Sequence, residues 1–403
     1  MAGDSKNSSL VAARAAKKDE FYTQYIDIQR EVEAYLEFDP DTFRGKVVYC
    51  NCDDPFESNF FKYFAANFNK LGLKKLISTS YDGSPIAGQG TLFPEYNEGN
   101  GKRQKPKALA VILDQVNDED GDGAANVTDV ELFLQRNKAA RKALKADGDY
   151  AGGDFRSAEC IALLKEADIV VTNPPFSLFR EYVAHLMEHG KKFVIVGPKN
   201  AVTYKDIFPL IKDTRLWLGR GFANGNAYFS VAAGSSREFA DGVYDESTGL
   251  VKFRNVGWFT NLDHGRRHEK LPLMTLADNL KFSKHKEIKG KASYDQYDNY
   301  DAIEVPFTDA IPSDYEGAMG VPISFLDKYN PDQFEILGIT DRDNNSGLKT
   351  REYTKADVPN PGDLNRRGVI RTGGRYRSTF ARLLIRHRTA PQEGHSSGRQ
   401  AEN

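Results

Sequence analysis

The sequence contains few of the residues that mark several common protein classes. Its 403 residues include three cysteines, four methionines and two tryptophans. The cysteines, Cys50, Cys52 and Cys160, are too few and too scattered for a disulfide framework. Cys50 and Cys52 also lie on an expected strand, where their side chains point to opposite faces. We therefore expect buried thiols rather than a disulfide or a metal site.

The sequence also lacks long apolar runs and a dominant charge. No apolar run reaches the ~18 residues needed to cross a bilayer, and the N-terminus has no signal-peptide core. These absences predict a cytoplasmic protein with no membrane partner. The formal net charge of −2 does not by itself indicate a nucleic-acid-binding protein. No repeat of fixed period is visible, which argues against a solenoid.

Short apolar segments alternate with helical patterns through the first half of the chain. Five of these segments read as strands, at 46–52, 74–80, 108–113, 168–172 and 192–198. Alternating strands and helices predict a doubly wound α/β sheet that binds its ligands at the carboxyl ends of the strands. Beyond about residue 222 the segments become short, aromatic-rich and interrupted by Gly, Asn, Asp and Pro, which favours a second, α+β domain.

An acidic stretch between two expected elements resembles the start of a calcium-binding loop. It reads Asp118-x-Asp120-x-Asp122-Gly123 and is followed by an expected helix over Val130–Leu144. Its twelfth position is Asp129 rather than glutamate, and a strand rather than a helix is expected before it. We favour a solvated turn over a calcium site, and we expect no bound metal.

The most informative stretch runs from Asp168 to Phe176. An acidic residue leads a β-branched run that ends on Asn173-Pro174-Pro175-Phe176, where two prolines prevent further strand pairing. The loop combines an amide side chain, carbonyls without competing N–H groups and an aromatic face, which together suit a planar substrate bearing an amine. The tetrapeptide alone could be a strand-ending turn. Its place after a buried strand favours the catalytic loop of an amino-group methyltransferase.

Basic residues gather in two places in the second half. Between Leu364 and Gln392 there are eight arginines and no acidic residue, which favours phosphate contact over a merely solubilising edge strand. His264 and His268 are four residues apart and could be metal ligands. Because two arginines separate them and no third ligand is evident, contacts with DNA phosphates are the better interpretation.

Several segments together resemble the EcoRI-type adenine-specific DNA methyltransferases. The resemblance covers most of residues 12–390 and is carried by Lys17–Thr23, Val47–Pro55, Asp168–Phe176, Gly257–His264 and Met319–Tyr329. It implies transfer of a methyl group from S-adenosylmethionine to the N6 amine of an adenine flipped out of double-stranded DNA. The small, polar first residues predict a flexible N-terminus (1–16), and the change of pattern near residue 222 sets the domain boundary. With the resemblance, we expect a Rossmann-like doubly wound domain that binds the cofactor (17–221) and an α+β target-recognition domain (222–403).

The resemblance assigns roles to individual residues. It places the catalytic loop at Asn173, Pro174, Pro175 and Phe176. It places S-adenosylmethionine against Lys18, Phe21 and Thr23 at the methionine end, Asp53 after the first strand, and Asp154 and Phe155 at the adenine. The Gly-x-Gly turn common in methyltransferases is replaced here by Asn51-Cys52-Asp53. Candidate contacts with DNA, from their basic surroundings, are His264, Arg266, Arg267, Arg375 and Arg377.

The expected partner is therefore double-stranded DNA. No obligate protein partner is evident, which is compatible with a monomer. An RNA base amine or a protein glutamine amide would suit the same loop, but the large basic region argues against a protein substrate. A catalytically silent DNA-binding protein would also keep this fold, although an intact Asn-Pro-Pro-Phe loop argues for activity.

Overall fold

The computed structural model describes residues 21–52, 58–81, 108–137, 140–231, 242–341 and 344–388. Two expected cofactor residues, Lys18 and Asp53, lie outside these ranges. The chain divides into two compact units, Met1–Arg266 and Arg267–Asn403. The division lies later in the chain than the expected one at 221/222, because strands formed by residues 227–260 pair with strands of the first unit.

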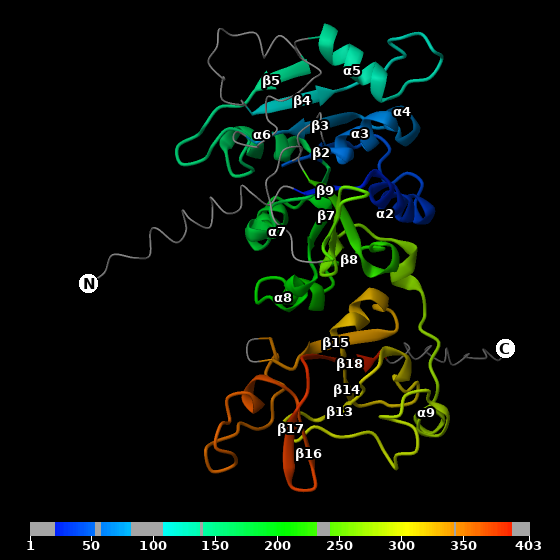
Figure 1. The fold of residues 1–403 in the computed structure, drawn as a ribbon, viewed down its shortest axis with the longest axis vertical. Coiled ribbons are helices and arrows are strands. Elements are labelled where there is room, and N and C mark those ends of the chain that lie inside the picture. The colour runs from blue at the N-terminus through cyan, green and yellow to red at the C-terminus, as the bar shows by residue number, and fades with distance from the viewer. Residues whose placement is uncertain are drawn as a thin grey trace, which may run out of the picture. The chain divides into compact units, whose positions relative to one another are not determined.

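The first unit is built around an eight-stranded sheet (Figure 1). The four strands at its centre, β3, β2, β6 and β7, are parallel to one another. The outer strands β4 and β12 run antiparallel to this centre. In spatial order the sheet contains β5 (Arg141–Ala143), β4 (Leu109–Leu113), β3 (Lys75–Thr79), β2 (Val47–Cys50), β6 (Ile169–Thr172), β7 (Lys192–Pro198), β12 (Val256–Thr260) and β8 (Trp217–Leu218).

Helices cover both faces of this sheet, so its central strands are apolar and β-branched rather than alternating. Figure 1 shows α2 and α3 on one side of the strands and α6 and α7 on the other. On the first side Val171 and Trp258 share a core cluster with Phe60 of α3. On the second, Phe179 of α7 packs against Phe259 with ring centroids 4.9 Å apart. The helices of this unit are α2 (Tyr25–Phe38), α3 (Asn59–Ala66), α4 (Phe68–Leu71), α5 (Val127–Arg136), α6 (Ala158–Glu166), α7 (Phe179–Glu188) and α8 (Phe208–Lys212).

The helix expected over Val130–Leu144 is shorter than predicted. It begins at a capping box formed by Asn126 and Asp129 and ends at Arg136. Residues 141–143 instead form β5, which pairs with β4. This pairing satisfies backbone N–H and C=O groups of β4, which a helix over the same residues would leave without partners. Sequence periodicity over 130–144 was therefore a poor guide, because an edge strand competed with the last turn of the helix.

The acidic stretch forms a tight turn in front of α5. Asp129 is buried, and its carboxylate accepts hydrogen bonds from the backbone N–H groups of Glu119 (2.7 Å), Asp120 (3.1 Å) and Asn126 (2.7 Å). Carboxylate oxygens of Asp118, Asp120 and Asp129 lie within 4.8 Å of one another. Backbone N–H groups therefore partner the Asp129 carboxylate, and the solvated turn remains a prediction.

A small antiparallel sheet completes the first unit. Its strands, in spatial order, are β1 (Phe21–Thr23), β9 (Ala227–Val231), β11 (Leu250–Phe253) and β10 (Tyr244–Asp245). Because β1 pairs with β9, the first described residues lie beside residues 227–231, which were expected to begin the second domain.

The second unit has its own mixed sheet and a separate hairpin. The four-stranded sheet contains, in spatial order, β13 (Ala302–Glu304), β14 (Ala318–Pro322), β18 (Arg382–His387) and β15 (Phe334–Ile339). The hairpin consists of β16 (Val369–Thr372) and β17 (Arg375–Ser378), and the unit has one α-helix among the described residues, α9 (Leu276–Phe282). Both units thus mix helices and strands. Among the residues described, no helix combines the length and apolarity that spanning a bilayer requires.

Candidate active site

The order of the strands indicates where the first unit binds ligands. Neighbouring parallel strands β2 and β6 continue in opposite directions across the sheet, β2 to β3 and β6 to β7. At such a reversal the connecting helices lie on opposite faces and leave a crevice outside the carboxyl ends of the two strands. Asn51 follows β2 there, and Asn173 follows β6.

Side chains tie these strand ends together. Asp168 fixes the start of β6, since its Oδ2 accepts a hydrogen bond from the N–H of Val47 at 2.8 Å. At the other end the hydroxyl of Thr172 donates to the backbone oxygen of Asn51. The side-chain oxygen of Asn51 accepts a further hydrogen bond from Thr79 Oγ1 at 3.0 Å. The carboxyl ends of β2, β3 and β6 therefore form one hydrogen-bonded edge.

The Asn-Pro-Pro-Phe loop lies directly on this edge. Asn173 is half-buried, Pro174 is buried, and Pro175 and Phe176 are half-buried. Phe176 begins a short 3₁₀ turn, η3 (Phe176–Leu178), and packs against the core cluster that includes α3. Because neither proline has an N–H to donate, the loop presents carbonyl and amide oxygens in a backbone of restricted φ.

The turn after β2 keeps a glycine-like conformation without a glycine. Cys52 has φ of 61°, in the left-handed region that L-residues rarely adopt. The side-chain oxygen of Asn51 accepts a hydrogen bond from the N–H of Cys52 at 2.7 Å and so stabilises this conformation. The described start of this turn thus has a positive φ, although the usual glycines are absent. No disulfide joins any of the three cysteines, all of which are described.

The Gly152-Gly153 loop approaches the same edge. Gly153 has φ of +78°, and a Cβ atom there would overlap the carbonyl oxygen of Ser80, which follows β3. Asp154 comes next and is bound by Arg156, whose Nε and Nη2 donate to it at 2.9 and 2.8 Å. Phe155 is 3% exposed and meets the ring of Tyr182 edge-on at 5.0 Å. Asp154 and Phe155 therefore lie near the edge, with their side chains engaged by protein groups.

Comparisons with known proteins agree with this geometry. The family described as adenine-specific methyltransferase EcoRI matches residues 9–388. The chain belongs to this family. It is thus an adenine-specific DNA methyltransferase, as the resemblance seen in its sequence implied.

Similar proteins come from three bacteria. The type II methyltransferase M.EcoRI of Escherichia coli is 42% identical over 354 residues, covering 85% of this chain and 94% of the relative. M.MpnI of Mycoplasma pneumoniae is 34% identical over 328 residues, covering 81% and 83%. M.MgeORF184P of Mycoplasma genitalium is 33% identical over 386 residues, covering 93% and 97%. No solved structure matches.

Thr23 is one of the expected cofactor residues that the structure of this methyltransferase describes, and its hydroxyl has no hydrogen-bond partner among the described residues. Its backbone oxygen accepts a hydrogen bond from Asn59 Nδ2 at 2.8 Å, at the start of α3. The residue is 2% exposed, and its Oγ1 is buried without a hydrogen-bond partner among the described residues. A buried hydroxyl of this kind costs free energy unless another polar group meets it. The position therefore fits a polar group of a methyl donor. Phe21 lies two residues earlier on β1.

The expected DNA-contacting residues are distributed over both units. His264 and Arg266 belong to the first unit, and Arg267, Arg375 and Arg377 to the second. His264 is 3% exposed, its Nε2 lies 3.1 Å from the oxygen of Leu218, and its ring meets Tyr35 edge-on. Its burial is that of a core residue.

The four arginines differ in exposure. Arg266 is exposed, and its guanidinium donates to the oxygen of Arg220. Arg267 is half-buried in η6 (Gly265–His268). Arg375 and Arg377 are exposed on β17. Arg266 and Arg267 thus share the short helix η6, and Arg375 and Arg377 share the strand β17.

Sequence reasoning missed the residues that hold the site in shape. Asn51, Thr172 and Arg156 carry its hydrogen bonds, but the sequence interpretation gave none of them a role. Asn51 could have been noticed, because an asparagine after a buried strand is suited to capping a tight turn. Arg156 had no such signal, since it acts through Asp154 and through Glu181 on α7.

Proposed function

We propose that the first unit is a Rossmann-like catalytic domain that uses S-adenosylmethionine as its methyl donor. The acceptor is the N6 amine of an adenine flipped out of double-stranded DNA, because a stacked base cannot present its amine to the donor. One observation carries the proposal. The Asn173 loop follows the central strand β6 at the reversal of strand order, and Thr172 links it to the end of β2.

Asn173 and Pro174 act on the amine of the adenine. That amine is a weak nucleophile because its lone pair is delocalised into the ring. In our proposal its two N–H groups donate to the side-chain oxygen of Asn173 and the carbonyl of Pro174, which favours a pyramidal nitrogen with an available lone pair. Positive charge that develops on nitrogen strengthens both hydrogen bonds, so they stabilise the transition state more than the ground state. Phe176 stacks on the base and fixes its plane.

The donor occupies the crevice next to this loop. When bound, the donor would supply its sulfonium methyl group to the adenine nitrogen and leave as a neutral thioether, and the nitrogen would then lose a proton. Thr23 meets a polar group near the methionine end. Lys18 and Phe21 belong to the same end, and Asp53 contacts the donor from the loop after β2. Asp154 and Phe155 lie at the adenine of the donor, where Arg156 and Tyr182 hold their side chains.

The second unit recognises the target sequence in this proposal. Its hairpin carries Arg375 and Arg377, two exposed cationic side chains that suit contact with DNA. His264 supports the fold of the first unit rather than touching phosphate, because its ring is buried.

Replacing Asn173 with Ala tests the proposal. We expect methyl transfer to duplex DNA to fall by roughly 10²- to 10³-fold, the usual cost of removing one group that stabilises developing charge. Cofactor affinity, measured by calorimetry, should change little. The matched control is Asn200→Ala, an exposed asparagine just after the neighbouring strand β7. Full activity of Asn173→Ala on labelled methyl transfer would contradict the mechanism.

A further inference from the structure

The hairpin β16–β17 stands apart from the main sheet of the second unit (Figure 1). Its strands pair with Thr372 opposite Arg375, and Gly373 and Gly374 form the turn with φ of 58° and 78°. Two positive φ values are typical of a type I′ turn, whose twist matches that of paired strands. The register places Thr372, Arg375 and Arg377 on one face of the hairpin.

The base of the hairpin is held by two residues of a preceding loop. The N–H of Asp298 donates to the oxygen of Val369 at 2.7 Å, and the side-chain oxygen of Asn299 accepts from the N–H of Val369 at 2.8 Å. Asn299 Nδ2 also donates to the oxygen of Arg367 at 2.9 Å. Val369 and Ile370 are buried at this base. The hairpin therefore starts from a fixed point.

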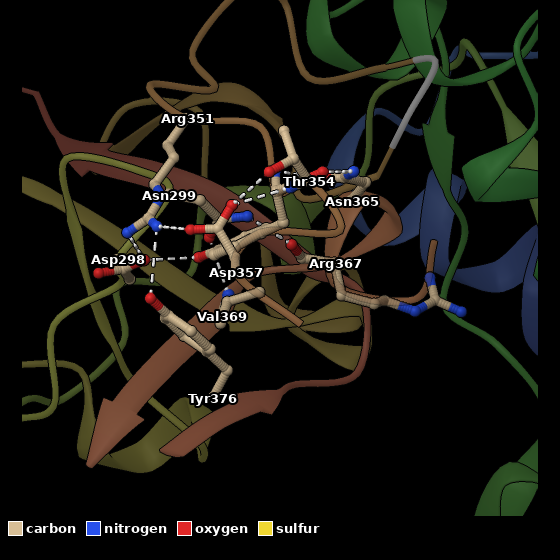
Figure 2. Close-up of polar contacts among 10 residues, drawn as sticks. Asp298, Asn299, Arg351, Thr354, Asp357, Asn365, Arg367, Val369 and Tyr376 are labelled. Atoms are coloured by element: carbon tan, nitrogen blue, oxygen red, sulfur yellow. Dashed lines mark hydrogen bonds and ion pairs between the residues drawn. The ribbon is translucent and has the colours of Figure 1, made fainter. Parts of the chain in front are cut away.

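The opposite face of the hairpin is occupied by a cluster around Arg351. In Figure 2 the guanidinium of Arg351 lies between Asp298 and Asp357, with the hydroxyl of Tyr376 below it. The distances are 2.7 Å to Asp298 and 3.3 Å to Tyr376. Arg371 lies over the ring of Tyr376 from the hairpin itself, 5.4 Å from its centroid. Protein groups thus fill this face and brace the strands.

The face that carries Arg375 and Arg377 is open toward the turn, while Ile370, opposite Arg377 on the same face, is buried against the core of the unit. Both side chains are exposed, and neither takes part in an ion pair within the described part of the unit. At its foot lies a cavity of about 830 Å³ whose lining includes Arg367 and Arg377. Phe380 borders this cavity and is 82% exposed. The lining also contains four acidic residues, of which Glu304 is paired with Arg382 and Asp295 with Lys291; the other two are Glu287 and Asp363.

We infer that this hairpin is a ribbon that enters the major groove of the substrate duplex, where Arg375 and Arg377 read guanine edges. The inference rests on the proposed role of the second unit. The major groove is roughly 12 Å wide and admits a two-stranded β-ribbon, and a guanidinium donates two parallel hydrogen bonds to O6 and N7 of guanine. Side chains that read the edge of a nucleobase must be held in a fixed position. The hydrogen bonds at the start of the hairpin and the cluster around Arg351 hold these strands in place. Arg375 and Arg377 are thus specificity-determining residues.

Mapping methylated adenines tests this assignment. Wild type, Arg375→Ala and Arg377→Ala are expressed in cells without adenine methylation, and modified positions are read across the genome. We expect each variant to methylate a motif relaxed at a guanine position. With purified protein, discrimination between the wild-type site and a site substituted at that guanine should fall roughly 5- to 150-fold, which corresponds to about 1–3 kcal/mol. Arg386→Ala is the control, because Arg386 is an exposed arginine on β18 paired with Glu335.

Other outcomes separate the inference from the proposed function. If both variants keep the wild-type motif and lose rate equally on every site, with a salt slope smaller by about 0.9 each, the arginines contact phosphates and the inference is overturned. An unchanged motif and unchanged rate overturn it as well. If the wild-type protein methylates no adenine, the proposed function fails instead. Melting curves that match the wild type exclude misfolding as the cause.

Discussion

We predict that no side chain is tolerated at Gly153. Substitutions there test whether the Gly152-Gly153 loop must lie against Ser80 at the end of β3. The residue combines φ of +78° with an approach so close that a Cβ atom would overlap the oxygen of Ser80 and lie 3.1 Å from Ala108 Cβ. Gly148 in the same loop has φ of +56°, but a Cβ there would meet nothing within 4 Å. Replacing each with Ala therefore separates steric overlap from backbone strain.

The expected magnitudes differ accordingly. Left-handed backbone costs an L-residue about 1–2 kcal/mol, which is all that Gly148→Ala should lose. Gly153→Ala bears the same strain and must also push a backbone carbonyl away from β3, and overpacking of this kind adds about 1–3 kcal/mol. Because Asp154 follows directly, the displaced loop should also weaken binding of S-adenosylmethionine, whereas Gly148→Ala should bind normally.

Tryptophan fluorescence during urea denaturation measures these changes in the right part of the molecule. The two tryptophans, Trp217 and Trp258, both belong to the first unit, so the signal reports that unit alone. Calorimetric titration with S-adenosylmethionine gives the affinity. Equal destabilisation of the two variants would refute the reasoning, because it would mean that the loop does not need its close approach to β3.

Two further predictions concern buried carboxylates. Glu304→Ala should destabilise the second unit by about 3–5 kcal/mol, because it leaves the guanidinium of Arg382 and the hydroxyl of Tyr297 without their buried acceptor, while Glu335→Ala at an exposed pair should cost at most about 1 kcal/mol. Similar losses in scanning calorimetry would contradict this. Burial raises the pKa of Glu31 above its ordinary value of 4.5, so the Glu31 carboxyl binds a proton more tightly in the folded first unit than in the unfolded chain. The free energy of unfolding of this unit should therefore fall as the pH rises from 4.5 through the raised pKa. Glu31→Gln should remove this loss, and urea midpoints that decline equally with pH in both proteins would count against it.

The central strands were predictable from the sequence because burial on both faces leaves a local signal. Val47–Cys50 and Ile169–Thr172 are continuous apolar runs that end at polar loops, and both are fully buried in the sheet. The edge elements were not predictable in this way. β5 and β1 are short, and what makes them strands is a partner elsewhere in the chain, β4 for one and β9 for the other.

The same distinction explains which parts of the site could be seen in advance. Asn173 could be singled out as a candidate because prolines end a strand next to it, and its role stays a prediction. The hydrogen bond from Thr172 to Asn51 joins residues 121 positions apart, and no local pattern encodes it. His264 illustrates the opposite error, since a histidine beside two arginines suggests a basic surface, yet packing against Tyr35 buries its ring.

The turn at Cys52 shows that a missing motif need not mean a missing geometry. The common glycines of this turn provide conformational freedom, and what the site requires is the positive φ itself. Here a cysteine adopts φ of 61° at a cost of about 1–2 kcal/mol, and the Asn51 side chain offsets part of that cost. Such strain persists only where surrounding contacts hold it in place, and Asn51 is held by Thr79 and Thr172 from the two neighbouring strands. The strained turn and the Asn173 loop therefore meet at Asn51, whose side chain holds the turn while its backbone oxygen accepts the hydrogen bond from Thr172 next to the loop.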